Sequence, residues 1–346
     1  MTGRERLLAA ARRQPVDATP VWFMRQAGSL FQDARELIQK HDIMTVAKTP
    51  ELSSRVAMMP VEKLGVDGCV LFADIMLVLN GMGVPYHVVP ETGPIIDRPV
   101  RSAEDIRAIR VVEPEEGSPY VLDAIRIIKN ELGDRAAIVG FSGSPFTLVC
   151  YMIEGKPSRT YDRSKAFMFA HQDLWHEFMG KATDVCVRYL KGQVRAGIDV
   201  AQLFDSWVGV LSPSQYEEFV LPYSRRIFAE LRSLGVPSIH FGTGNAGLLE
   251  LMAAAGPDVV GVDWRVNIDE AWARVGAAKG IQGNLDPTLL LAPWSTVERE
   301  AGDVLRRVDG RPGHIYNLGH AIVGGTKTDT LQRLVDLVHN HSAVKA

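Results

Sequence analysis

The chain has 346 residues, of which 46% are hydrophobic and 23% are charged, with 31 glycines and 19 prolines. This composition is typical of a folded globular protein and excludes a collagen, a coiled coil and a disordered chain. The net charge of -3, without a basic block or a charged tail, argues against nucleic acid or a membrane surface as a partner.

The N-terminus and the cysteines favour the cytoplasm. Residues 1–14 have the apolar spacing of an amphipathic helix and lack the core of a signal peptide. No apolar run approaches the roughly 20 residues of a membrane span. Cys69, Cys150 and Cys186 are odd in number and show no C-x-x-C spacing. We therefore expect buried thiols in a reducing compartment.

Short runs rich in Val, Ile and Phe alternate with helical periodicity along the whole chain. The runs are residues 20–24, 69–73, 137–141, 200–204, 238–241, 259–262, 280–283 and 314–318. This alternation predicts a parallel sheet covered by helices. Eight parallel strands in about 250 residues or more are typical of a closed barrel, whereas doubly wound sheets usually have about five or six. The predicted fold class is α/β, a (β/α)8 TIM-type barrel.

One domain is expected over residues 1–346, because no linker, low-complexity tract or short repeat divides the chain. Residues 80–116 are the least regular, and we expect an excursion beside the barrel there. Thr49 and Ser212 each precede a proline, which predicts two helix starts with a capping hydroxyl. Gln215 is placed to complete a capping box with Ser212.

Barrel enzymes hold their sites at the carboxyl ends of the strands, so the polar residues after each apolar run are the candidates. They are Arg25 to Gly28, Asp74, Ser142 to Pro145, Asp205 to Trp207, His240 with the turn 242–244, Asp263 to Arg265, Asn284 to Asp286, and Asn317 to His320. We expect these groups to converge on one mouth of the barrel.

Four of these residues, together with Tyr151, have chemistry that suits a site, and each also has a structural interpretation. Arg25 is suited to a bidentate contact with a carboxylate, or pairs with a surface carboxylate. Asp74, in apolar company, is suited to stabilise positive charge, or caps a helix. Tyr151 is alternatively a core residue, Ser206 a helix cap and His320 a turn residue.

Other chemistries lack their motifs. Residues 324–328 resemble part of a phosphate loop but lack its spacing, and no dinucleotide fingerprint, nucleophile elbow or H-E-x-x-H occurs. His171 and His176 are five residues apart and do not form the usual one-face pair of zinc ligands. The sequence thus indicates neither a nucleotide nor a metal.

Six ordered motifs resemble the uroporphyrinogen decarboxylase family over nearly the whole chain. They are Met24 to Gly28 (MRQAG), Phe72 to Ile75 (FADI), residues 140–155 (GFSGSPFTLVCYMIEG), residues 202–213 (QLFDSWVGVLSP), residues 283–287 (GNLDP) and residues 316–320 (YNLGH). The resemblance implies a barrel enzyme, commonly a homodimer, that works without a cofactor. It implies removal of carbon dioxide from the four acetate side chains of uroporphyrinogen III to give coproporphyrinogen III, in heme and tetrapyrrole biosynthesis.

The same resemblance implies roles for the candidate residues. Asp74 would bind the pyrrole N–H groups and stabilise a developing cation, and Arg25 and His320 would hold substrate carboxylates. Tyr151 and Ser206 would contact the side chains of the reacting pyrrole. The remaining expected substrate-binding residues are Gln26, Ala27, Gly28 and Ser29. Arg25 and a bound water are both open as the proton donor.

Two departures from the family pattern concern the substrate. Family members usually have arginine where this chain has Ser29 and Ile38. Hydrogen bonds to charged groups contribute about 1.5–3 kcal/mol each, so the loss of two cations would weaken the binding of a substrate with eight carboxylates. Lys327 is a candidate replacement, or a solvated surface residue.

Two alternative functions remain open on the sequence. The first is a related corrinoid-dependent methyltransferase, whose zinc is held by a His-x-Cys pair and a later Cys; this chain has His240-Phe241-Gly242 at that place, so the thiolate ligand is missing. The second is a tetrapyrrole-binding protein without catalysis, which the lost arginines suggest.

Overall fold

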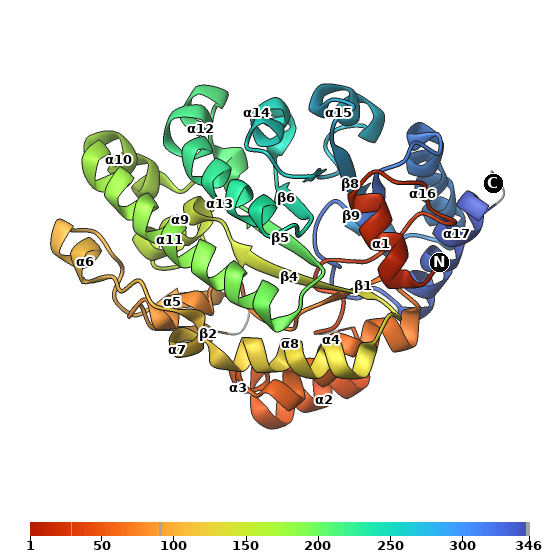
Figure 1. Ribbon diagram of the computed structural model, residues 1–346, viewed down its shortest axis with the longest axis horizontal. Coiled ribbons are helices and arrows are strands. Elements are labelled where there is room, and N and C mark those ends of the chain that lie inside the picture. Colours follow the sequence, from red (N-terminus) through yellow and green to blue (C-terminus); the bar gives the residue numbers. More distant parts are fainter. Residues whose placement is uncertain (29, 90–91, 344–346) are drawn as a thin grey trace.

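The computed structural model describes residues 1–28, 30–89 and 92–343. A parallel sheet curls into a barrel, and helices cover its outer face (Figure 1). Its strands, in order around the sheet, are β1 (Gly68–Val70), β4 (Ala137–Gly143), β5 (Val200–Asp205), β6 (Ser238–Gly242), β7 (Val259–Gly261), β8 (Gly280–Leu285) and β9 (His314–Leu318). The predicted α/β barrel is confirmed. These strands read as apolar runs because they are buried on both faces.

Helices connect successive strands. Those before β4 are α1 (Gly3–Ala11), α2 (Gln32–His41), α3 (Ile43–Lys48), α4 (Pro50–Leu64), α5 (Val78–Gly81), α6 (Ala103–Ala108), α7 (Pro114–Gly117) and α8 (Pro119–Leu132). Those between β4 and β7 are α9 (Pro145–Glu154), α10 (Asp162–Ala170), α11 (Gln172–Ala196), η1 (Val208–Val210), α12 (Pro213–Phe219), α13 (Leu221–Ser233), η2 (Asn245–Gly247) and α14 (Leu249–Ala254). The last are α15 (Ile268–Val275), η3 (Pro287–Leu291), α16 (Trp294–Val308) and α17 (Thr328–Ala343). Within the described ranges, no helix has the length and apolar character needed to cross a membrane.

The first predicted strand, residues 20–24, is not a regular strand. Val21 forms a single parallel bridge to Tyr316 of β9, in which the Tyr316 N–H donates to the Pro20 carbonyl at 2.8 Å. On its other side, the Val21 carbonyl accepts the Asp67 N–H at 2.8 Å, but the Val21 N–H donates to the Asp67 carboxylate at 2.8 Å. A side chain therefore replaces a ladder bond where the barrel closes.

Gln26 completes this closure. Its Oε1 accepts the Phe23 N–H at 2.9 Å, and its Nε2 donates to the Gly68 carbonyl at 2.8 Å. The Gln26 side chain is fully buried, and both ends of its amide are bonded within the chain. Gln26 was expected to bind substrate; this structure places its side chain in the wall of the barrel instead.

Asp67 also ties two helices to the closure. Its Oδ1 accepts Arg6 Nη1 of α1 at 2.6 Å, and its Oδ2 lies 2.8 Å from His339 Nε2 of α17. The carboxylate is almost fully buried, so these polar partners offset the cost of removing it from water. One side chain thus joins the first helix, the last helix and the segment before Arg25.

The irregular residues 80–116 form an excursion beside the barrel, as predicted. Its hairpin pairs β2 (Tyr86–Val89) with β3 (Gly93–Ile96) in antiparallel register. The Ile96 N–H donates to the Gly155 carbonyl at the end of α9, at 2.8 Å. Lys181 Nζ of α11 donates to the Ile106 and Arg107 carbonyls at 2.8 and 3.0 Å, which secures the end of α6. The excursion therefore packs against α9 and α11.

The two predicted capping hydroxyls have different outcomes. Ser212 and Gln215 form the predicted capping box at the start of α12. Thr49 stands before α4, but the prediction that its hydroxyl caps the helix is wrong. The Thr49 hydroxyl instead donates to the Thr45 carbonyl of α3 at 2.8 Å, so it is not available to the next helix.

The three cysteines are free and buried, as expected. Burial raises the pKa of the Cys69 and Cys186 thiols to about 12. Such thiols remain protonated and unreactive at neutral pH.

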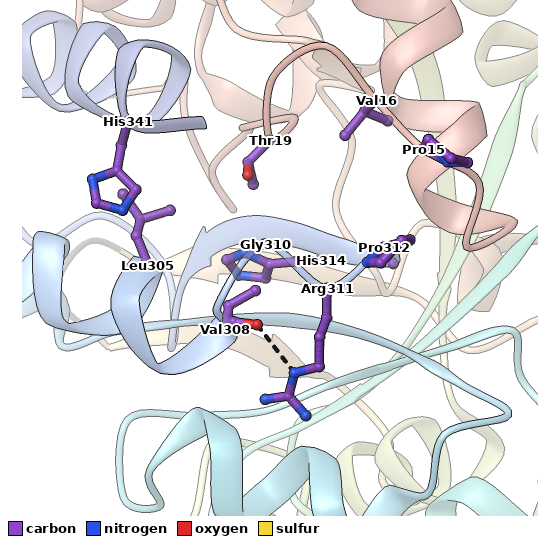
Figure 2. A pocket seen from close by; sticks show the side chains of 11 residues that line it. Pro15, Val16, Thr19, Leu305, Val308, Gly310, Arg311, Pro312, His314 and His341 are labelled. Carbon is purple, nitrogen blue, oxygen red and sulfur yellow. Dashed lines mark hydrogen bonds between the residues drawn. The ribbon is translucent and has the colours of Figure 1, made fainter. Parts of the chain in front are cut away.

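A cavity of about 160 Å³ lies at the amino-terminal end of the barrel, between residues 15–19 and the turn that precedes β9 (Figure 2). Buried His314 lines it, and its Nε2 lies 2.9 Å from the Gly283 carbonyl. Burial lowers the pKa of His314 to about 4, so the ring is neutral at pH 7. None of the candidate site residues that the structure describes lines this cavity.

We expect Asp67→Asn to lower the free energy of unfolding in urea by about 3 kcal/mol, because the amide removes the buried negative charge that pairs with the partly buried Arg6 guanidinium. The matched control is Asp17→Asn, which removes the other carboxylate on Arg6 but from a position where 43% of the side chain is exposed. That change should cost less than about 1 kcal/mol. Equal costs for the two variants would contradict a special role for the buried carboxylate.

Candidate active site

The predicted site residues come from different elements at the carboxyl ends of the strands. Arg25 follows residues 20–24, Asp74 follows β1, and Tyr151 lies on α9 after β4. Ser206 follows β5 and His320 follows β9. The Arg25 charge lowers the pKa of Asp74, of Tyr151 and of His320. Asp74, Tyr151 and His320 therefore each lie within electrostatic reach of Arg25.

Arg25 stands on an unusual backbone. Its φ is 55°, in the left-handed region, which non-glycine residues occupy at a cost. Its neighbour Gln26 is bonded on both sides into the barrel wall, and Met24 is buried. The Arg25 side chain is exposed. The closure of the barrel therefore fixes the backbone from which this guanidinium reaches the mouth.

Asp74 has a single hydrogen bond from the described backbone to its carboxylate. Its Oδ1 accepts the Met76 N–H at 2.7 Å. Burial raises the pKa of Asp74, while this N–H and the Arg25 charge lower it. Asp74 does not cap α5, whose cap residue is Leu77. A carboxylate with a raised pKa gains stability from any further N–H donor or cation that a ligand brings.

Buried phenols surround Asp74. The Asp74 charge raises the pKa of Tyr86, Tyr151 and Tyr189 beyond what burial does. The Tyr86 hydroxyl of β2 is buried and has no hydrogen-bond partner in the described part of the chain. Sequence analysis missed Tyr86 and Tyr189, because they come from the excursion and from α11, and no spacing links them to Asp74.

An aromatic wall lies beside this group. The Trp207 ring lies 5.6 Å from the Tyr151 ring, edge to face, and 5.2 Å from the Tyr161 ring. Ser206 precedes Trp207, and its carbonyl accepts the Thr243 hydroxyl. The interpretation of Ser206 as a helix cap is wrong, since Trp207 is the cap residue of η1 and Ser212 that of α12.

A buried polar cluster of Asp205, Ser144 and His240 lies next to the residues that carry this wall. Asp205, fully buried, accepts the Ser144 hydroxyl at 2.5 Å and lies 3.3 Å from His240 Nε2. The Ser144 Oγ also accepts the Thr147 N–H at 3.0 Å and caps α9. One carboxylate therefore joins the helix that carries Tyr151 to the strand end that carries Ser206.

His320 is neutral at pH 7. Burial lowers its pKa below 6.5, the Arg25 and Arg265 charges lower it further, and Asp263 raises it. Its ring lies 6.5 Å from the Phe241 ring. A neutral imidazole among cations can donate or accept a hydrogen bond and leaves the positive charges free for anions.

The other predicted positions differ in their surroundings. Ala27 is buried and Gly28 is half-buried, with 3.8 Å between a Cβ built on Gly28 and the Phe72 ring. Ser29 lies outside the described residues. Ile38 is half-buried and packs against the apolar core. Lys327 is exposed in the loop between β9 and α17.

The zinc site of the methyltransferase alternative has no counterpart in the described ranges, where no group of three or more His, Cys, Asp or Glu could hold a metal ion. His240, which would be the first ligand, is fully buried against Asp205. Its partner position is Gly242, which offers no donor side chain.

Comparison with known proteins agrees with these motifs. The family described as "Uroporphyrinogen decarboxylase (URO-D)" matches residues 2–341. Uroporphyrinogen decarboxylase of Carboxydothermus hydrogenoformans is 47% identical over 97% of this chain and 96% of its own length. That of Sorangium cellulosum is 48% identical over 97% and 96%.

A solved structure shares the fold. A methyltransferase from Methanosarcina mazei superimposes with a TM-score of 0.83 over 99% of both chains, at 22% identity. The match to residues 2–341 and the two relatives near half identity over almost their full lengths decide the assignment. The chain belongs to the uroporphyrinogen decarboxylase family.

Proposed function

We propose that this protein is a carboxy-lyase that decarboxylates the four acetate side chains of uroporphyrinogen III to coproporphyrinogen III, in heme and tetrapyrrole biosynthesis. Membership of the family supports the reaction. The observation that carries the proposal to this chain is Asp74, a half-buried carboxylate at the mouth of the barrel that has one N–H donor and lies within reach of the Arg25 charge.

The chemistry needs electrostatics more than bond-making groups. A proton adds to the ring carbon beside the acetate-bearing carbon, and the pyrrole becomes a cation. The bond to the carboxylate then breaks, its electron pair neutralises the cation, and carbon dioxide leaves. The new methylene carbon takes a proton, and the ring carbon returns one. A fixed negative charge near the ring nitrogen lowers the barrier to this cation.

Asp74 is the residue suited to that task. Its pKa, raised by burial, means that its charge is less stable here than in water, so pyrrole N–H donors and a developing cation would stabilise it further. Arg25 and His320 hold carboxylates of the substrate, and Tyr151 and Ser206 contact the reacting pyrrole. Either Arg25 or a bound water supplies the proton. The aromatic wall of Trp207 offers an apolar face to the macrocycle.

We further propose that the protein works in the cytoplasm as a homodimer. Free, buried cysteines fit a reducing compartment, and a dimer is the assembly that the family resemblance implies. Light scattering after size-exclusion chromatography should give twice the 38.1 kDa of one chain. A mass of one chain at micromolar concentration would contradict the dimer.

Anaerobic incubation with uroporphyrinogen III should give products with seven, six, five and then four carboxylates, separable by chromatography. Asp74→Asn should retain the fold and lower kcat on the order of 100-fold or more. The amide oxygen still accepts the pyrrole hydrogen bonds, but it has no negative charge to stabilise the cation.

Asp123→Asn, on the exposed face of α8, is the matched control and should keep full activity. Normal turnover by folded Asp74→Asn would refute the electrostatic role. If the wild-type protein is folded and removes no carboxylate, the reaction itself is refuted.

The charge coupling at the mouth gives an independent prediction. Arg25→Gln should raise the pKa of His320, because the Arg25 cation opposes protonation of the ring. NMR titration of the imidazole signals, assigned with a His320→Asn variant, measures this change without substrate. Arg333→Gln, on the outer helix α17, should leave the His320 pKa unchanged. An unchanged His320 pKa in Arg25→Gln would contradict the electrostatic coupling between the two residues.

A further inference from the structure

Arg265 is a cation with three anchors at the carboxyl end of β7. Its backbone N–H donates to Asp263 Oδ1 at 3.0 Å, and its Nη1 donates to Asp263 Oδ2. Its guanidinium lies 4.1 Å from the centre of the Trp264 ring. Asp263 is fully buried and also accepts the Gly244 N–H at 2.6 Å, so it is itself fixed. The guanidinium is therefore oriented before any ligand arrives.

The anchored guanidinium remains open to a ligand. The Arg265 side chain keeps 51% of its surface exposed. Among the residues that the structure describes, the side chain donates a hydrogen bond only through Nη1, to Asp263. Its Nε and Nη2 edge is therefore free for the two parallel N–H bonds that a carboxylate accepts from arginine.

Arg265 belongs to the same mouth as the candidate site. The Arg265 charge lowers the pKa of His320, as the Arg25 charge does. Trp264, beneath Arg265, packs directly on Gly319, where a built Cβ would lie 2.5 Å from Trp264 N and 3.0 Å from its Cε3. Because Gly319 precedes His320, this close approach brings Arg265 to the rim beside His320.

The described residues offer few other cations for this task. Ile38 stands where family members usually have arginine and packs on the core. Arg35 uses its Nη1 to donate to the Leu30 carbonyl at 3.1 Å. Lys327, the replacement considered from the sequence, is exposed and has none of the anchors that hold Arg265.

We propose that Arg265 binds a carboxylate of the tetrapyrrole at the rim of the mouth and so determines affinity for the highly charged substrate. This inference rests on the proposed function for the identity of its ligand. Arg265 acts on a carboxylate remote from the breaking bond, so it contributes to binding and leaves the chemical step unchanged.

The test compares Arg265→Gln and Arg265→Lys with the wild-type enzyme in the anaerobic assay. We expect Arg265→Gln to raise KM roughly tenfold or more, the effect of one lost charge-assisted hydrogen bond, with kcat little changed. The KM of the variant should also depend less steeply on salt. Arg265→Lys should recover part of the affinity, because it keeps the charge without the bidentate edge.

Arg311→Gln is the matched control. Arg311 also lies over a tryptophan, 4.6 Å from the Trp272 ring, but it lines the cavity at the opposite end of the barrel, where it donates to the Val308 carbonyl (Figure 2). Its loss should leave KM unchanged. A normal KM for folded Arg265→Gln, or an equal rise for both variants, would overturn the inference.

A binding measurement separates this inference from the proposed reaction. Uroporphyrin carries the same carboxylates as the substrate and does not react, and its binding is followed by quenching of tryptophan fluorescence. If the wild-type protein binds uroporphyrin but does not turn over uroporphyrinogen, the proposed reaction is refuted, and the binding of the variants still tests the role of Arg265. Weaker binding by Arg265→Gln than by Arg311→Gln then supports it. Equal binding by the two variants, or no binding by the wild type, overturns it.

Discussion

Two side chains complete the closure of the barrel beside the backbone hydrogen bonds of residues 20–22, and the candidate site depends on that closure. Asp67 and Gln26 supply the hydrogen bonds that a regular strand would supply with its backbone. Side chains are more specific than ladder bonds, because each fixes one residue at one place. The closure therefore does more than complete the wall: it sets the position of Arg25, which stands between Met24 and Gln26 at the mouth.

Three carboxylates at the mouth, two of them fully buried and Asp74 half-buried, differ in how many hydrogen-bond donors the chain gives them. Asp205 has Ser144 and His240, and Asp263 has two backbone N–H groups and an arginine side chain. Asp74 has one backbone N–H and neighbouring phenols. Charges satisfied within the fold hold loops in place, whereas a charge left short of donors is available to a ligand. This contrast distinguishes Asp74, for which we propose a role in the reaction, from Asp205 and Asp263.

The sequence predicts those features of the fold that depend on local, periodic patterns of apolar residues. It predicted the seven strands of the barrel sheet, β1 and β4 to β9, and the polar residues that follow them, because burial on both faces leaves continuous apolar runs. It failed at residues 20–24, where an apolar run forms a single β-bridge and the Asp67 side chain accepts a backbone N–H in place of a neighbouring strand. It also missed Tyr86, whose pKa the Asp74 charge raises, since this residue comes from the excursion and not from a strand end of the barrel. The sequence did contain Asp263-Trp264-Arg265 at a strand end, but only the fold shows the aspartate holding the arginine.

The left-handed backbone at Arg25 has a consequence for how this protein can evolve. Glycine would adopt that conformation more easily and would relieve a strain on the order of 1 kcal/mol. A lineage selected for stability alone would drift to glycine at this position. An arginine there costs part of the stability of the fold and places a cation at the mouth, so glycine at this position would add stability but remove the guanidinium that we propose to bind substrate.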